Sequence, residues 1–349
     1  MIIPRIILGI ETSCDETAVA IIIDGEVVAD RTTRQVLHEH YGGVVPELAS
    51  RAHEQLLAPA VKGVLEEASL TPRDISGVAV TYGPGLAGAL LVGLSFAKGF
   101  ASAMGIPFWA VNHIEAHLWI SQLSYQEIPT PALALIVSGG HTLLIAVEEF
   151  GEYRFLGSTR DDAVGELFDK VGRVIGFSFP AGAQIDKLAM EYTDKPVLFP
   201  VSRVKSDPFA FSFSGIKTAV LNHIQGSCKP SSFGEYHIGD DHRQAICAGM
   251  MHSVAKTLTG PILHALGERR YEAIVVGGGV SASRYLRREI GKLADETGIP
   301  LIIPPVHHCT DNGAMIAYLG FLLASHGVEQ SSLSQDVDPS AKIYRERNQ

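Results

Sequence analysis

The stretch RIILGIETSCDETAVAII (Arg5–Ile22) places an apolar run on each side of a short polar segment, which is typical of a β-hairpin. The stretch PALALIVSGGHTLLIAV (Pro131–Val147) repeats this order, with glycine and hydroxyl residues at its tip. Asp24–Gly25 follows the first hairpin and is a strong turn signal, so a third antiparallel strand is expected. The two stretches share few identical residues, but their order indicates an internal structural duplication.

Strands and helices alternate after each hairpin, which predicts an α/β fold. The expected helices lie at 47–68, 87–104, 281–297 and 311–324, and the expected strands at 77–82, 107–112, 272–279 and 300–303. We expect a first domain at 1–125 and a second at 126–325. The proline-rich stretch at about 177–240 is interpreted as an insertion of small helices and loops, and the tail 326–349 as packing back on the first domain.

Composition excludes some classes of protein. The 349 residues carry a formal charge of −10, so bulk electrostatics do not favour general nucleic-acid binding. An RNA partner would need a local basic patch, such as Arg284, Arg287 and Arg288, or a second protein. The four cysteines are scattered without a CxxC pair, which is typical of reduced thiols in a cytoplasmic protein. The apolar segment 87–104 contains Lys98 and several glycines, and we interpret it as a buried helix, not a membrane span.

The segment HIEAH sets His113 and His117 four residues apart, on one face of a helix. The metalloprotease motif HExxH needs its glutamate directly after the first histidine, and Ile114 stands there instead. A bare HxxxH is more often a pair of surface or cap histidines. Asp311 in VHHCTDNGAMIA supplies a carboxylate as a third ligand, and Thr310 or Asp311 is expected to cap the last helix. His307, His308 and Cys309 are alternative ligands.

The two glycine-tipped hairpins indicate anion-binding concavities lined by backbone N–H groups, although such turns often only reverse the chain. Glu11, Asp15 and Glu16 lie close together at the first tip, where their negative charges would repel one another unless a metal ion or a bound donor intervened. The simpler alternative is an acidic turn exposed to solvent. In the second half, Asp169 lies on an amphipathic helix, where an acid can accept from a ribose hydroxyl.

Nine motifs occur in the order found in the TsaD family, the tRNA N6-adenosine threonylcarbamoyltransferases, formerly called O-sialoglycoprotein endopeptidases. They are GIETSCDET, VPELASRAH, TYGPGLAGALLVG, VNHIEAH, VSGGHT, FDKVGR, FSFSGIKT, GGGV and CTDNGAM, and the likeness covers about Ile6 to Leu323. This resemblance implies two RNase H-like domains around an interdomain cleft, as in actin-like ATPases, sugar kinases and Hsp70. The implied reaction moves the threonylcarbamoyl group from L-threonylcarbamoyl-adenylate to N6 of the adenosine just 3′ of the anticodon. The tRNAs concerned read codons that begin with A, and AMP is released.

The resemblance also implies roles for individual residues. The metal ligands would be His113, His117 and Asp311, with Fe²⁺ expected and Zn²⁺ as the alternative. Asp15 and Glu16 match acids linked to activity. The substrate-binding positions would be Ile136, Val137, Ser138, Gly139, Gly140, Asp169, Gly182, Asp186 and Ser283. The implied partners are tRNA, a TsaB-like paralogue and a TsaE-like ATPase, with no membrane.

Two departures from the family pattern concern the adenylate. Ser283 stands where the family has asparagine, so that contact is expected to be lost or bridged by water. The family's PGGP is PAGA here, with Ala181 and Ala183. Two other functions are ranked lower. A regulatory nucleotide-binding module of the Hsp70-like class leaves the two histidines and Asp311 unexplained, and a metal-dependent peptidase lacks its base.

Overall fold

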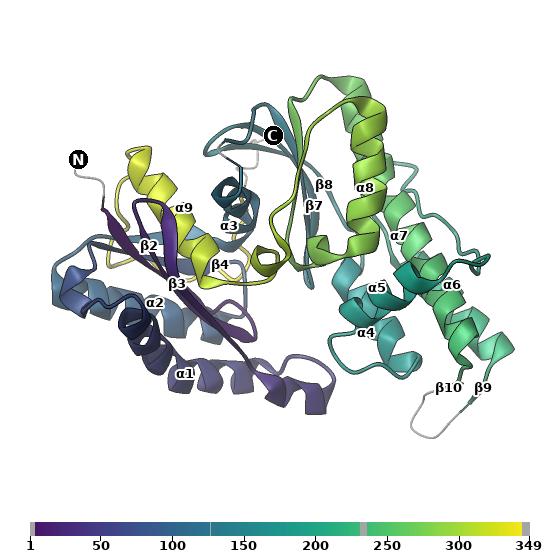
Figure 1. The fold of residues 1–349 in the computed structure, drawn as a ribbon, viewed down its shortest axis with the longest axis horizontal. Helices are drawn as coiled ribbons and strands as arrows, with labels where there is room; N and C mark the ends of the chain where they lie inside the picture. The colour runs from purple at the N-terminus through teal and green to yellow at the C-terminus, as the bar shows by residue number, and fades with distance from the viewer. Residues whose placement is uncertain (1–3, 126, 231–235, 344–349) are drawn as a thin grey trace. The chain divides into compact units, whose positions relative to one another are not determined.

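The computed structural model describes residues 4–125, 127–230 and 236–343, and the chain divides into two compact units (Figure 1). The first unit combines Met1–Gln126 with Thr310–Gln349, and the second is the continuous segment Glu127–Cys309. Each unit is built on a five-stranded mixed sheet. The predicted α/β class is therefore confirmed.

The sheet of the first unit begins with an antiparallel meander of β1 (Ile6–Glu11), β2 (Glu16–Ile23) and β3 (Glu26–Arg34). The turn between β2 and β3 has positive φ at both Asp24 (51°) and Gly25 (88°), the conformation that the Asp-Gly pair favours. Two parallel strands, β4 (Gly77–Gly83) and β5 (Phe108–Asn112), continue from β1, giving the order β3-β2-β1-β4-β5.

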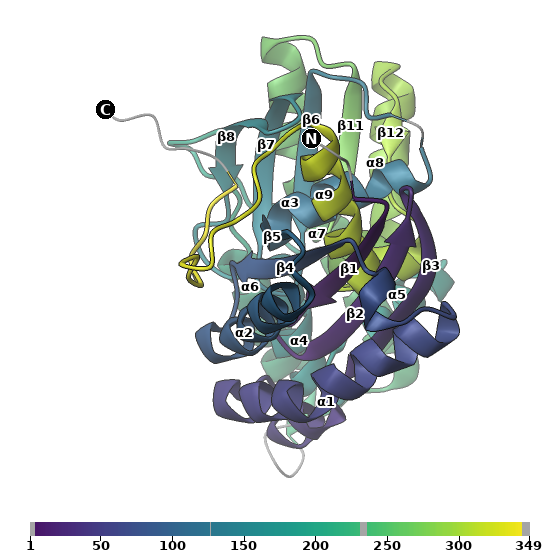
Figure 2. The same cartoon turned by 90° about the vertical axis from the view of Figure 1, so that its left-hand side faces the viewer.

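Helices cover both faces of this sheet (Figure 2). Leu8 and Ile10 of β1 pack with α1 (Pro46–Glu67) and α2 (Ala87–Met104) in one apolar cluster. The alternate residues of β1 face α9 (Gly313–Ser325), because successive side chains of a strand point to opposite faces. The short α3 (His113–Trp119) follows β5 and contacts α9.

The last helix approaches the sheet closely because glycines line the contact. A Cβ on Gly9 would lie 2.4 Å from the backbone nitrogen of Ala317, and one on Gly320 would lie 2.4 Å from Cβ of Ala79. The division into units therefore falls at Cys309/Thr310 and not at the expected residue 325, since α9 completes the first unit. The tail continues on this unit, where Asp338 donates its backbone N–H to the carbonyl of Tyr82 at 2.9 Å.

The second unit repeats the strand order of the first. Its strands are β6 (Ala132–Val137), β7 (Thr142–Glu149), β8 (Glu152–Ser158), β11 (Ala273–Gly277) and β12 (Leu301–Ile302). Read as β8-β7-β6-β11-β12, an antiparallel meander is extended by two parallel strands, as in the first sheet. The inferred internal duplication is confirmed in the topology, although it leaves little trace in residue identity.

Among its described residues, the second unit has five α-helices: α4 (Val164–Val174), α5 (Gly182–Glu191), α6 (Ser214–Ser227), α7 (Asp240–Glu268) and α8 (Arg284–Thr297). Leu133 and Leu135 of β6 pack with residues of all five helices in one buried cluster. Two short strands, β9 (Lys229–Pro230) and β10 (Tyr236–His237), pair between α6 and α7. The long α7, which the sequence analysis did not single out, contacts α5, α6 and α8.

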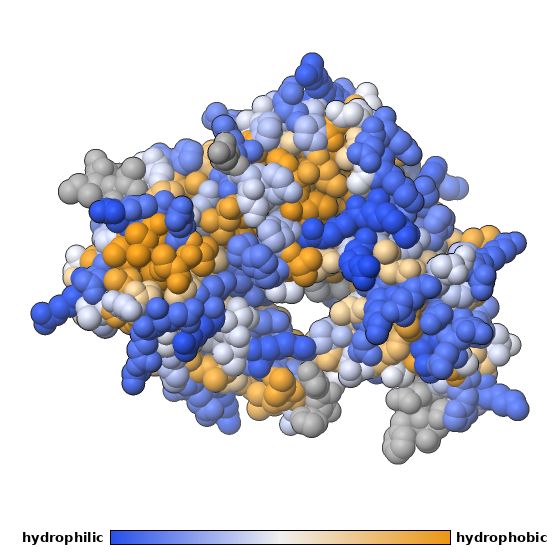
Figure 3. Space-filling model, in the orientation of Figure 1, coloured by the Kyte–Doolittle hydropathy of each residue, from blue (hydrophilic) through white to orange (hydrophobic). Residues whose placement is uncertain are grey.

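On the face seen in Figure 3, hydrophobic residues gather in several areas that are surrounded by hydrophilic ones. Among the described residues, α2 is the one helix long and apolar enough by composition to cross a membrane. Its Ala89, Leu90, Leu94 and Ala97 are buried, and α2 packs against α1 and β4. This one-sided burial is that of a helix lying on a sheet.

Candidate functional site

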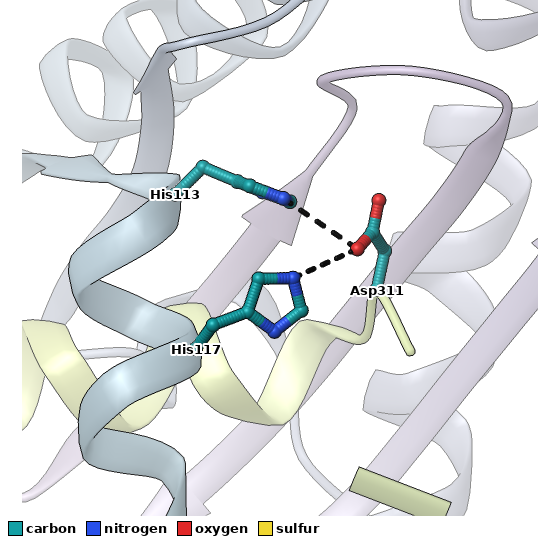
Figure 4. A group of neighbouring side chains, drawn as sticks. All are labelled: His113, His117 and Asp311. Atoms are coloured by element: carbon teal, nitrogen blue, oxygen red, sulfur yellow. Dashed lines mark hydrogen bonds and ion pairs between the residues drawn. The ribbon is translucent and has the colours of Figure 1, made fainter. Parts of the chain in front are cut away.

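Three predicted metal ligands come together within the first unit (Figure 4). His113 begins α3 directly after β5, where the side chain of Asn112 caps the helix by accepting from the N–H groups of Ile114 and Glu115. His117 lies one turn further along α3. Asp311 precedes α9, and its Oδ1 lies 3.0 Å from Nε2 of His117 and 3.5 Å from Nε2 of His113.

The donor set fits a transition-metal ion. One ligand atom from each of the three residues lies within 4.8 Å of the others, and the two Nε2 atoms converge on one carboxylate oxygen. Two imidazoles and one carboxylate suit iron or zinc and leave coordination positions open for a ligand. The cluster is thus consistent with a metal site.

The expected cap of α9 was wrong in detail. Asn312, and neither Thr310 nor Asp311, caps this helix by accepting from the N–H of Met315 at 2.8 Å. The carboxylate of Asp311 consequently points at the histidines. The alternative ligand Cys309 is fully buried and lies 3.0 Å from a guanidinium nitrogen of Arg287.

Glu11 is a functional candidate that the sequence analysis did not assign. It ends β1, is fully buried, and its Oε2 lies 3.1 Å from Nδ1 of His113. A carboxylate on the second ring nitrogen fixes the tautomer of a metal-binding histidine and leaves Nε2 free for the ion. Although burial lowers the pKa of His113, the negative charges of Asp311 and Glu11 outweigh it and raise the pKa to about 9.

Asp15 and Glu16, the predicted catalytic acids, lie at the tip between β1 and β2. Asp15 is buried, with 8% of its surface exposed. Burial raises the pKa of Glu16 to about 9, and the charges of Asp311 and Asp15 add to this effect. Both acids lie in the same unit as the histidine cluster.

The second glycine tip lies between β6 and β7. Ile136 and Val137 are buried strand residues, whereas Gly139 and Gly140 are exposed at the tip. The hydroxyl of Ser138 accepts from the N–H of His141 at 3.1 Å and closes the turn.

Two neighbouring glycines allow other backbone segments to approach this tip. A Cβ on Gly165, at the start of α4, would lie 2.6 Å from Cα of Gly139. A Cβ on Gly278, which has φ +88°, would lie 2.4 Å from the carbonyl oxygen of Val137. The start of α4 and the turn after β11 therefore flank the loop.

The remaining predicted substrate residues surround α5 and the start of α8. Asp169 on α4 accepts from the N–H of Ala181 at 2.8 Å, and Gly182 begins α5. Asp186 on α5 is buried and accepts from the hydroxyl of Ser283 at 2.5 Å. It also accepts from the N–H groups of Arg284 and Tyr285, so it holds the first turn of α8.

The proposed basic patch is only partly available. The guanidinium of Arg287 is half-buried and donates to the carbonyls of Ser281 and Pro304 at 2.7 and 2.5 Å. Arg288 lies over the ring of Tyr285, 4.5 Å from its centroid. Burial of a long polar side chain cannot be read from a run of arginines, and Arg287 serves the fold.

Comparison with known proteins identifies the family. The model of the family "TsaD: tRNA N6-adenosine threonylcarbamoyltransferase" matches residues 26–318. The chain belongs to this family. The threonylcarbamoyltransferase of Clostridium botulinum (strain 657 / Type Ba4) is 42% identical over 339 residues, with 97% of each chain covered. That of Thermosipho africanus is 40% identical over 97% of this chain and 100% of its own length.

Solved structures agree on the architecture. HypF from T. kodakarensis aligns with a TM-score of 0.61 at 11% identity, covering 93% of this chain and 48% of its own. Component A of the (R)-2-hydroxyglutaryl-CoA dehydratase of Acidaminococcus fermentans aligns with a TM-score of 0.55 at 16% identity, covering 92% of this chain and 99% of its own. These likenesses concern the fold alone.

The chain is accordingly a tRNA N6-adenosine threonylcarbamoyltransferase, an enzyme with tRNA as substrate. The two lower-ranked functions, the regulatory nucleotide-binding module and the peptidase, are set aside.

Proposed function

We propose that the enzyme uses L-threonylcarbamoyl-adenylate as donor and modifies the adenosine just 3′ of the anticodon in tRNAs that read codons beginning with A. A bond forms between N6 and the carbamoyl carbon, the bond from that carbon to the phosphate oxygen breaks, and AMP leaves with the electron pair. The amine N6 is a poor nucleophile, but the mixed anhydride is already activated. The enzyme then acts mainly by positioning and charge stabilisation.

The convergence of His113, His117 and Asp311 supports this proposal most strongly. These residues would hold Fe²⁺, with Zn²⁺ as the alternative. Such an ion supplies a Lewis acid for a phosphoryl or carbonyl oxygen. Glu11 orients the ring of His113, and the bond of Asn112 to the start of α3 sets the direction of both histidines.

In the second unit, we assign the adenylate to the tip Ile136–Gly140 and its surroundings. The exposed glycines 139 and 140 leave the backbone open to a phosphate, and the start of α4 beside them adds the positive end of a helix. Asp169 and Gly182 are proposed to contact the adenosine part. Asp186 and Ser283 are proposed to shape the same region through the first turn of α8.

The N6 amine loses a proton during transfer, and Asp15 and Glu16 are the candidate acceptors. Because its pKa is raised to about 9, Glu16 could accept this proton at neutral pH only from its minor, ionised form. We further propose that the enzyme works in the cytoplasm with a TsaB-like paralogue and a TsaE-like ATPase. Arg284 and Arg288 are exposed and are the proposed contacts for tRNA phosphates, although Nε of Arg288 also pairs with Oε1 of Glu289 at 3.0 Å.

The test is nucleoside mass spectrometry on unmodified tRNA incubated with the adenylate, this protein and the two partners. A transcript with guanosine at the acceptor position is the negative substrate. The reaction is repeated with a metal chelator and with His113→Ala. His264→Ala, a change to a half-exposed histidine of α7, is the control variant.

Threonylcarbamoyladenosine that forms with wild type and His264→Ala, and is lost with chelator and His113→Ala, supports the proposal. Product that survives both treatments overturns the role of the metal cluster. Absence of product from the adenylate, with partners shown to bind, overturns the proposed donor.

A further inference from the structure

Three consecutive carbonyls at the tip between β1 and β2 are each held by a different part of the first unit. The carbonyl of Ser13 accepts from the N–H of Leu86, just before α2, at 2.8 Å. That of Asp15 accepts from the N–H of Gln35 at 3.0 Å. That of Cys14 accepts from the side chain of a residue on α1, His53. Of these three bonds, this is the one whose donor is a side chain, so exchanging that side chain removes the bond; the other two donors are backbone N–H groups.

The donor to Cys14 is His53. Its Nε2 lies 2.9 Å from the carbonyl oxygen of Cys14, and its Nδ1 lies 2.8 Å from the hydroxyl oxygen of Thr17. Because a carbonyl can only accept, Nε2 carries the proton, and Nδ1 of the neutral ring accepts from Thr17. The two partners are the residues on either side of Asp15–Glu16.

We propose that His53 is a positioning residue that holds Asp15 and Glu16 in their productive place by bonding to the residues on both sides of them. This inference rests on the proposed role of the two acids. Within the part of the chain that the structure describes, His53 forms hydrogen bonds to Cys14 and Thr17 but not to the proposed metal ligands or the two carboxylates, so its effect passes through the tip itself.

His53 and its partner Thr17 are both held in the core of the first unit. His53 is fully buried on α1, a helix of 22 residues anchored in the core by Ala49, Leu57 and Val61. Thr17 is also fully buried and is paired in the sheet with Thr33 of β3. The ring therefore connects two fixed elements across the acids. A displacement of about 1 Å at a reacting group can cost about 100-fold in rate.

The first test compares His53→Leu, which removes both bonds, with His223→Leu as a control. His223 is a half-buried histidine on α6 of the second unit, and its Nε2 lies 2.8 Å from Nε2 of His242. We expect His53→Leu to lower kcat for threonylcarbamoyl transfer about 10- to 100-fold. KM for tRNA and metal content are expected to stay unchanged, and His223→Leu is expected to retain kcat.

A second pair of variants keeps the test valid if His53→Leu does not fold. Thr17→Val removes the hydroxyl with little change in shape, whereas Thr17→Ser keeps it. We expect kcat to fall for valine and to be preserved for serine. In a double-mutant cycle, His53→Leu/Thr17→Val is expected to be no slower than His53→Leu alone, because both changes act through one contact.

Hydrogen-exchange mass spectrometry of the peptide containing residues 12–18 supplies a readout that needs no turnover. Faster exchange in His53→Leu, but not in His223→Leu, is expected. Wild-type exchange at the tip together with kcat within twofold of wild type would overturn the positioning role. If wild type itself forms no product, the proposed donor fails, and exchange alone decides whether His53 holds the tip.

Discussion

Replacing Glu11 by glutamine is expected to weaken metal binding although Glu11 is not a predicted ligand. Its carboxylate faces three donors: the N–H of Ser13 at 2.5 Å, the hydroxyl of Thr81 at 2.5 Å and Nδ1 of His113 at 3.1 Å. Glutamine has one acceptor oxygen and one NH₂ group. If the NH₂ faces His113, Nδ1 must accept, and the ring proton moves to Nε2, where it blocks the ion.

The magnitude follows from the role of this second ring nitrogen. Loss of an outer carboxylate on a metal-binding histidine costs about 10- to 100-fold in metal affinity, or about 1.4 to 2.7 kcal/mol. Nδ1 of His117 is buried and has no hydrogen-bond partner among the described residues. Nδ1 of His113, in contrast, has two partners, Oε2 of Glu11 at 3.1 Å and the hydroxyl oxygen of Ser13 at 3.3 Å. Only the Glu11 carboxylate is charged, so we assign the larger part of this effect to Glu11.

The assay is a competition titration of Zn²⁺ or Co²⁺ against a chromogenic chelator, with thermal unfolding of the metal-free protein as a folding check. Thr81→Val is the matched control, because it removes a donor to the same carboxylate without touching His113. We expect Glu11→Gln to bind about 10- to 100-fold more weakly and Thr81→Val to bind like wild type. A folded Glu11→Gln protein with wild-type affinity would refute the reasoning.

Three further outcomes can be measured. Gly9→Ala should lower the free energy of unfolding by about 3 kcal/mol, because its Cβ would lie 2.4 Å from the backbone of Ala317; chemical denaturation tests this, and an unchanged midpoint would contradict the close contact. Asp186→Ala should lower the melting temperature by freeing the first turn of α8; if melting is unchanged while KM for the adenylate rises, Asp186 acts on the substrate directly. Burial and the charge of His307 lower the pKa of His308 to about 4. Between pH 6.5 and 4 the unfolded chain therefore binds a proton that the folded chain does not, so the free energy of unfolding is expected to fall as the pH drops through this range. In His308→Gln, denaturant unfolding measured at several pH values should show a smaller fall.

Much of the fold could be predicted from residues that are close together in sequence. The Asp24–Gly25 turn, the apolar runs of the hairpins and the helix expected at 47–68 each depend on neighbours in sequence, and each is found within one residue of its expected place. Residue type was less decisive at the start of α9, where Thr310, Asp311 and Asn312 are all good caps. The backbone conformation of the chain at Asn312 made this residue the cap, and the residue types alone do not show that conformation.

Burial and long-range contact were the parts that sequence could not supply. Arg287 looks like a member of an exposed basic run, yet its guanidinium bonds carbonyls of the fold. Glu11 looks like one of three acids in a turn, yet it is the last residue of β1 and bonds His113 from 102 positions away. Such pairings depend on which strands become neighbours, and that is decided by the whole sheet.

The return of the chain to the first unit has a consequence for biosynthesis. The first 126 residues leave the ribosome without α9, which later covers one face of their sheet, whereas residues 127–309 form a continuous unit that can fold as it emerges. Asp311 arrives near the end of translation, long after His113 and His117. A nascent chain that still lacks Asp311 has two of the three proposed ligands at most, so the complete cluster can form only when synthesis is nearly finished.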